Sequence, residues 1–130
     1  MIVVDTSAMV AILWAETGNR RISAVLDTSD GLCIAAPTVL ELYLVTAGRY
    51  DASAGKKAVS ALGDFGIEIA PFTKSLTLIA FEAFERFGKG RHKAGLNFGD
   101  CMAYALAKSL DVPLLYKGND FALTDIRAAA

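Results

Sequence analysis

The chain has 130 residues, enough for one domain with a buried core, and we expect residues 1–130 to form a single domain. An apolar fraction of 54% and a mean hydropathy of +0.41 are high for a small globular protein, which suggests a surface that contacts a partner, such as a second copy of the chain. The net charge of −1 excludes attraction of nucleic acid by overall charge, so any such binding must depend on a local group of cations.

Strand-like and helix-like segments alternate along the chain. Residues 1–4 are apolar and include the adjacent Val3 and Val4, as in a strand that is covered on both faces. Similar strands are expected at residues 32–36, 67–70 and 112–116, with a small edge strand around 124–126. Helices are expected at residues 7–15, 17–27, 37–47, 52–65 and 98–110, with one more that ends at residue 87. The alternation predicts a three-layer α/β/α sandwich with a mainly parallel central sheet.

Helix caps follow from the residues before these segments. Thr6 or Ser7 is the expected N-cap of the first helix, and Thr73 or Ser75 is the expected N-cap of the helix that ends at residue 87. Residues 88–95 are polar and are expected to form a loop.

No apolar segment suggests a membrane protein, because the longest unbroken run, residues 8–15, is shorter than the about 20 residues that cross a bilayer. No basic region precedes the apolar N-terminus, which argues against a signal peptide, so a cytoplasmic protein is expected. Cys33 and Cys101 are far apart in apolar sequence and are expected to be reduced rather than to form a disulfide or a zinc site. The only histidine, His92, lies in the polar loop, which leaves no Ser-His-Asp set.

Asp5 directly follows the first strand, with the hydroxyls of Thr6 and Ser7 beside it. Ligands in open α/β sheets bind in the crevice at the carboxyl ends of the strands, so Asp5 is a candidate site residue. The alternative is that Asp5 only caps the helix that follows.

Two further carboxylates lie on helix faces that are otherwise apolar. Glu41 has no Lys or Arg at helical spacing to pair with it, and an unpaired ionised carboxylate on an apolar face is costly. An exposed edge of the helix is the alternative position for Glu41. Asp100 opens the last helix, where it is an N-cap or a first-turn acid unless Asn97 is the cap and leaves Asp100 free to point elsewhere.

Asp120 follows the last expected strand after a short turn, although residues 118–120 are also ordinary turn chemistry. Four such carboxylates at strand ends and inward-facing helix starts need a cation to offset their repulsion, and oxygen-only ligands select Mg²⁺ or Mn²⁺. These ions promote phosphoryl chemistry by activating water and stabilising the leaving oxygen.

Four segments, in this order, carry a resemblance to a known family: Asp5-Thr6-Ser7, Glu41 in the helix after the second strand, residues 97–107 (NFGDCMAYALA) and residues 114–126 (LLYKGNDFALTDI). With them the chain resembles PIN-domain proteins, and specifically the VapC toxins of bacterial toxin–antitoxin pairs. The resemblance covers essentially the whole chain. It implies a Mg²⁺- or Mn²⁺-dependent endoribonuclease that acts on tRNA or ribosomal RNA. It also implies a homodimer and a VapB-type antitoxin whose C-terminal segment blocks the site.

The resemblance also assigns roles by position. The catalytic and metal-binding acids of the family fall on Asp5, Glu41, Asp100 and Asp120. The adjacent hydroxyl falls on Thr6 or Ser7. Many relatives carry an acid where Asn119 stands, so either Asn119 or Asp120 faces the metal, and Asp125 is a further outlying candidate.

The polar segment before Asp100 contains cations that suit RNA phosphates, namely Arg86, Lys89, Arg91, Lys93 and, when protonated, His92. An ordinary solvated loop is the alternative. Phe98 or Tyr116 is a candidate for stacking on single-stranded bases.

Two other functions stay open at this point. Asn119 motivates a catalytically silent PIN-like module that binds RNA or a protein partner. Lys117, after a late strand, motivates a receiver-type phospho-acceptor, but the third strand runs into Pro71 with no aspartate to phosphorylate.

Overall fold

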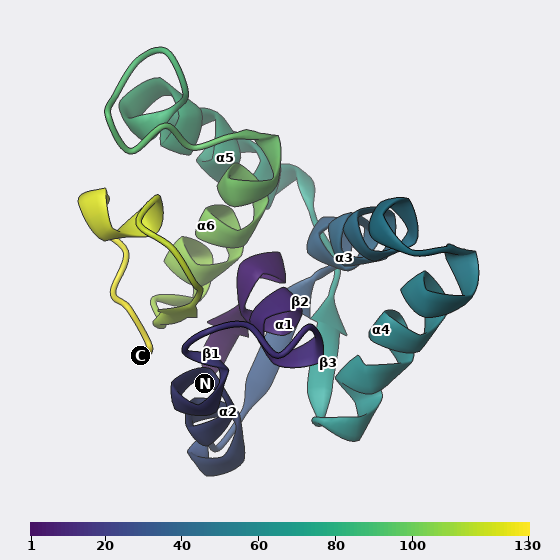
Figure 1. Ribbon diagram of the computed structural model, residues 1–130. Coiled ribbons are helices and arrows are strands. Elements are labelled where there is room, and N and C mark those ends of the chain that lie inside the picture. Colours follow the sequence, from purple (N-terminus) through teal and green to yellow (C-terminus); the bar gives the residue numbers. More distant parts are fainter.

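The computed structural model describes all residues, 1–130, and contains one sheet of four parallel strands in the order β3-β2-β1-β4. The strands are β1 (Ile2–Val4), β2 (Leu32–Ala35), β3 (Ile67–Ala70) and β4 (Leu114–Leu115). The helices are α1 (Thr6–Leu13), α2 (Asn19–Thr28), α3 (Ala36–Arg49), α4 (Ala52–Asp64), α5 (Lys74–Phe87) and α6 (Phe98–Leu110), with a short 3₁₀ helix η1 (Phe121–Leu123). Figure 1 shows α5 and α6 together on one side of the sheet.

The strands contribute alternate residues to two hydrophobic cores, one on each face of the sheet. Val3 and Leu114 pack in a core with residues of α5 and α6. Their neighbours Val4 and Leu115 pack in a second core with residues of α1, α2, α3 and α4. Because successive strand residues point to opposite faces, strands that are apolar throughout require helices on both sides. The predicted three-layer α/β/α sandwich with a parallel sheet is confirmed.

Thr6 or Ser7 as the N-cap of the first helix is wrong, whereas the alternative that Asp5 caps this helix is confirmed. The N-cap of α1 is Asp5, whose side chain accepts a hydrogen bond from the backbone N–H of Ser7, so Thr6 and Ser7 are already helical. The helix α2 starts later than expected, because Gly18 before it adopts a left-handed conformation with φ of 86°. Thr73 is the N-cap of α5, as one of the two alternatives predicted.

The C-terminal part of the sheet is shorter than expected. The predicted strand at residues 112–116 is reduced to β4, where Pro113 contributes a carbonyl to the backbone of Val3 but has no N–H to donate. The predicted edge strand at residues 124–126 does not form. Instead, the chain pairs with Leu114 two residues later, at Ala128.

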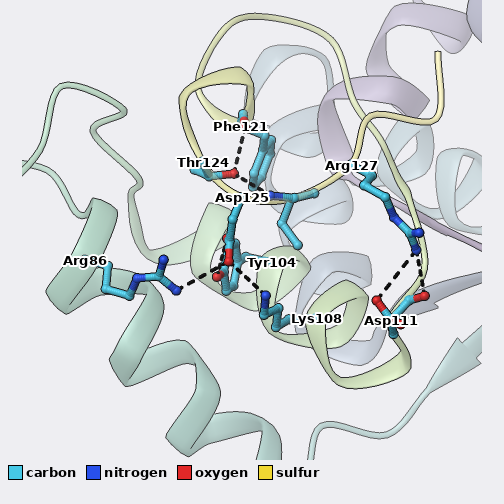
Figure 2. Close-up of polar contacts among 9 residues, drawn as sticks. Arg86, Tyr104, Lys108, Asp111, Phe121, Thr124, Asp125 and Arg127 are labelled. Atoms are coloured by element: carbon cyan, nitrogen blue, oxygen red, sulfur yellow. Dashed lines mark hydrogen bonds and ion pairs between the residues drawn. The ribbon is translucent and has the colours of Figure 1, made fainter.

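A turn explains why residues 124–126 leave the sheet. The hydroxyl of Thr124 donates to the carbonyl of Phe121 at 2.7 Å and accepts from the backbone N–H of Ile126 at 3.2 Å, which bends the chain after η1. Hydrogen-bonding residues of this kind compete locally with sheet pairing. Figure 2 shows this turn beside α6.

Asp125 attaches the same segment to α5 and α6 (Figure 2). The buried hydroxyl of Tyr104 donates to Asp125 Oδ1 at 2.7 Å, and Asp125 Oδ2 accepts from Lys108 at 2.8 Å and from Arg86 at 3.4 Å. Partial burial alone would raise the pKa of Asp125, but the hydrogen bonds from Lys108 and Tyr104 outweigh it and hold that pKa below its usual value. Asp125 is therefore an anchor of the fold, and its carboxylate oxygens are already bound.

The surface carries exposed apolar side chains, as the high apolar fraction of the sequence suggests. Phe81, Phe84 and Phe98 are exposed and line a largely apolar cavity of about 590 Å³ between α5 and α6. Cys33 and Cys101 are free and buried, as predicted, and burial raises the pKa of each thiol. None of the helices combines the length and hydrophobicity needed to span a bilayer.

Candidate active site

A cavity of about 390 Å³ lies at the carboxyl ends of β1 and β4, where the crevice of an open α/β sheet is expected. We call it the acidic cavity. Its charged lining residues are Asp5, Glu16, Glu41, Asp100 and Lys117. Three of the four predicted site carboxylates therefore meet here from α1, α3 and α6, although they are far apart in the sequence.

Asp5 is buried, with 4% of its surface exposed, and its two carboxylate oxygens differ. Oδ2 accepts hydrogen bonds from the backbone N–H of Ser7 at 3.0 Å and from its hydroxyl at 2.6 Å. Oδ1 is buried and has no partner. Burial raises the pKa of Asp5 from 3.8 to about 6, and repulsion from Glu41 adds to this against the hydrogen bonds of Ser7. Asp5 thus caps α1 with one oxygen and leaves the other available.

Ser7 connects this carboxylate to the segment after β4. Its hydroxyl donates to Asp5 and accepts the backbone N–H of Lys117 at 3.0 Å. The side chain of Lys117 then donates to Glu16 at 3.1 Å. Glu16 could not be singled out from the sequence, because its partner lies 101 residues further along the chain.

Glu41 is half-buried and turned toward α6 rather than lying on an exposed edge of α3. The hydroxyl of Thr6 donates to Glu41 Oε1 at 2.5 Å. The other oxygen lies so close to Gly99 that a Cβ there would overlap it. Glycine at position 99 therefore allows the Glu41 carboxylate to sit beside the first turn of α6.

Asn97 is the N-cap of α6 and Asp100 is an acid of its first turn, as the sequence analysis considered, but Asp100 is only partly free. The two residues form a capping box: Asn97 Oδ1 accepts the N–H of Asp100 at 2.9 Å, and Asp100 Oδ2 accepts the N–H of Asn97 at 3.1 Å. Burial, with repulsion from Asp5, Asp120 and Glu41, raises the pKa of Asp100 from 3.8 to about 7, against the hydrogen bond from Asn97. Only one of its oxygens is engaged by the cap.

Asn119 and Asp120 do not line the acidic cavity. Both are exposed in the turn between β4 and η1. Asp120 nevertheless lies close enough to Asp100 for its charge to contribute to the raised pKa of Asp100. The turn therefore places the fourth predicted carboxylate beside the cavity.

The predicted RNA-binding cations also lie outside the acidic cavity. Arg86 belongs to α5 rather than to the loop, and it is paired with Asp125. The guanidinium of Arg91 lies over the ring of Phe84, 5.4 Å from its centre. Lys89 and Lys93 are exposed in the loop and take part in none of the four ion pairs of the structure.

The acidic cavity suits a divalent cation that keeps part of its water shell. No three His, Cys, Asp or Glu side chains lie in an arrangement that could hold a metal ion by themselves. The cavity does contain a buried carboxylate oxygen without a partner, on Asp5, and two carboxylates whose pKa values are raised partly by mutual repulsion. Mg²⁺ commonly binds through one or two carboxylates together with several waters, so this donor set fits it.

The chain is similar to known proteins over almost its full length. Residues 2–126 match the family of PIN domains. The VapC ribonuclease Mb2004c of Mycobacterium bovis is 39% identical over 125 residues, which cover 95% of this chain and 90% of that protein. Ribonuclease VapC30 of Mycobacterium tuberculosis is 37% identical over 128 residues, 98% of each chain.

Solved structures show the same fold at low identity. VapC20 of Mycobacterium tuberculosis, described as a sarcin-ricin loop cleaving toxin, has a TM-score of 0.79 at 16% identity and covers 97% of this chain and 96% of its own. VapBC2 from Rickettsia felis, bound to a DNA fragment from its promoter, has a TM-score of 0.74 at 12% identity over 98% of this chain and 96% of its own.

Proposed function

Because this chain belongs to the PIN-domain family, in the branch of the VapC ribonucleases, we propose that it is an endoribonuclease toxin that cuts RNA at the acidic cavity. The observation that carries the proposal is the meeting of Asp5, Glu41 and Asp100 in one cavity at the carboxyl edge of the sheet. The receiver-type alternative is excluded by the family match over residues 2–126.

We propose that the reaction depends on Mg²⁺ or Mn²⁺. The residues that would hold the ion are Asp5, through its unpartnered Oδ1, with Glu41 and Asp100, and with Asp120 or Asn119 from the adjacent turn. When bound, such an ion polarises the phosphodiester and lowers the pKa of a water. Oxygen ligands favour these hard cations over zinc or copper.

The chain itself orients the carboxylates before substrate arrives. Each of the three has one oxygen held by a neighbour: Asp5 by Ser7, Glu41 by Thr6 and Asp100 by the backbone of Asn97. The other oxygen of each is left for binding. Fixing donor groups in advance lowers the reorganisation needed during reaction.

We propose tRNA or ribosomal RNA as substrate and a VapB-type antitoxin and a second copy of the chain as partners, in the cytoplasm. The support is the similarity to VapC ribonucleases and to solved toxin–antitoxin complexes, among them one from Klebsiella pneumoniae with a TM-score of 0.70 at 14% identity over 100% of this chain and 98% of its own. The exposed phenylalanines Phe81, Phe84 and Phe98 between α5 and α6 supply an apolar surface of the kind that protein partners cover.

The test is cleavage of total RNA by the purified chain, freed of any antitoxin, in Mn²⁺ and in EDTA. Discrete fragments are expected in Mn²⁺ and not in EDTA. Asp100→Asn is expected to abolish them, whereas Asp64→Asn, a matched change at an exposed position outside the cavity, is expected to retain them.

Cleavage that persists in EDTA would contradict the metal dependence. Fragments from Asp100→Asn at the wild-type rate would contradict the assigned site. RNA that is bound but intact under every condition would instead support the catalytically silent module.

A further inference from the structure

A second cavity, of about 270 Å³, adjoins the acidic cavity and has a different charge. Its lining includes Thr17, Arg21, Tyr116, Lys117 and Gly118, with no carboxylate side chain among them. Lys117 and Gly118 line both cavities, so the two are neighbours across this short segment after β4. We call the second one the cationic cavity.

We propose that the cationic cavity is a subsite for a phosphate of the RNA strand next to the bond that is cut, with Arg21 and Lys117 as its cations. This rests on the proposed function, since it assigns the adjacent part of the same substrate. The site lies on α2 and on the segment after β4. It is separate from the polar segment before Asp100, where the sequence analysis expects RNA-binding cations.

The charge of the acidic cavity favours such a subsite. Four carboxylates line that cavity against one lysine, and RNA carries a negative charge at every nucleotide. A divalent ion offsets repulsion only where it is bound, so the flanking phosphates need protein cations. None of Arg86, Lys89, Arg91 and Lys93 lines the acidic cavity or the cationic cavity, whereas Arg21 and Lys117 line the cationic cavity.

Arg21 is free to bind a phosphate. It is exposed on the first turn of α2 and takes part in none of the four ion pairs of the structure. A guanidinium presents a planar fork of N–H donors that matches two phosphate oxygens. Arg21 can therefore contact an anion in the cationic cavity without first giving up a protein partner.

Lys117 is held where it can serve both cavities. Its backbone N–H donates to Ser7, the residue that orients Asp5, and its ammonium is paired with Glu16 at 3.1 Å. The following Gly118 has φ of 107°, and no atom lies within 4 Å of the position of a Cβ there, so the space beside Gly118 is open. A strand that crosses Gly118 would pass from Arg21 to the carboxylates.

The experiment measures binding of a fluorescently labelled, mixed-sequence single-stranded RNA oligonucleotide in EDTA, by anisotropy at several salt concentrations. Arg21→Ala is expected to weaken binding about fivefold. It is also expected to make the negative slope of the logarithm of the association constant against log salt shallower by about 0.7, the value for one phosphate contact on single-stranded nucleic acid. Arg21→Lys is expected to restore most of the slope, because it keeps the charge.

Arg20→Ala is the matched control, since Arg20 is the neighbouring exposed arginine of α2 and does not line the cationic cavity. It is expected to leave affinity and salt slope near the wild-type values. In Mn²⁺, Arg21→Ala is expected to raise KM for RNA cleavage with little change in kcat, since it removes binding energy rather than a reacting group.

Equal effects of Arg20→Ala and Arg21→Ala would overturn the subsite, because they would indicate diffuse attraction by the whole helix. No effect of Arg21→Ala on a wild type that cuts RNA would also overturn the subsite and leave the nuclease standing. A wild type that neither binds nor cuts RNA would overturn the proposed function itself, and the subsite with it.

Discussion

Replacing Asp5 by asparagine is expected to stabilise the metal-free protein while it abolishes cleavage. Asp5 is buried, and its pKa rises from 3.8 to about 6, mainly because burial disfavours the charged form. Each pKa unit corresponds to about 1.4 kcal/mol, so the ionised carboxylate lowers the free energy of unfolding by about 3 kcal/mol at neutral pH. Asparagine has no charge to bury, although its amide group takes the place of an oxygen that has no partner. We therefore expect a net gain of about 1–2 kcal/mol for Asp5→Asn.

The sign of this effect depends on pH. The folded protein holds the Asp5 proton more tightly than the unfolded chain does, because its folded pKa of about 6 exceeds the ordinary value of 3.8. The stability that this proton contributes is fully present below the ordinary pKa and is lost as the pH rises through about 6. The advantage of Asp5→Asn is thus expected to be large at neutral pH and to shrink toward pH 4.

The assay is urea unfolding in EDTA at a series of pH values, followed by circular dichroism, for the wild type, Asp5→Asn and the control Asp64→Asn. Addition of Mn²⁺ is expected to stabilise the wild type more than Asp5→Asn, since a ligand that binds only the folded state raises its stability. A free energy of unfolding for Asp5→Asn that is equal to or below that of the wild type at neutral pH, with the same pH dependence, would refute the reasoning.

Two further substitutions test the surroundings of the site and the C-terminal anchor. Gly99→Ala is expected to fold normally but to displace the Glu41 carboxylate and reduce cleavage about a hundredfold, measured as kcat/KM beside Gly63→Ala, where no atom lies within 4 Å of the new Cβ. Wild-type activity for Gly99→Ala would show that the position of Glu41 is unimportant. Tyr104→Phe is expected to lower the free energy of unfolding in urea by about 1–2 kcal/mol, because it removes the buried hydrogen bond to Asp125. Tyr43→Phe removes a hydroxyl that makes no hydrogen bond to the rest of the chain, so it is expected to change the free energy of unfolding little. Equal losses of stability in the two variants would contradict the anchoring role of the contact between Tyr104 and Asp125.

The sequence predicted the fold well because its signals are local. Short, mainly apolar segments between helical patterns were sufficient to place all four strands and six helices, and residues 67–70 and 98–110 match β3 and α6 at both ends. The expected strand at residues 124–126 fails for two reasons. Thr124 forms a local turn, and Asp125 is bound to α5 and α6, a contact between residues far apart in the sequence that no local pattern reveals.

The candidate site could be predicted only where its residues carry a local signal in the sequence. Glu41 and Asp100 were noticeable as charges in apolar surroundings, and the structure brings both to the cavity that also contains Asp5. Glu16 and Arg21 carried no such signal, because each is an ordinary charged residue in a polar stretch. Their roles depend on how the segment after β4 lies beside the connection between α1 and α2, which is a property of the folded chain.

The acids of this protein fall into two groups that separate the fold from the site. Asp125 has a lowered pKa, since its hydrogen bonds and ion pairs favour the ionised form, so its charge stabilises the folded chain. Asp5 and Asp100 have raised pKa values, so their ionised forms oppose folding. A fold gains nothing from gathering carboxylates that destabilise it, and groups with pKa values perturbed in this way concentrate where a protein binds or transforms a ligand. The two raised pKa values in the acidic cavity, beside the lowered one at Asp125, therefore support the proposal that RNA is cut at this cavity and not at the polar network around Asp125.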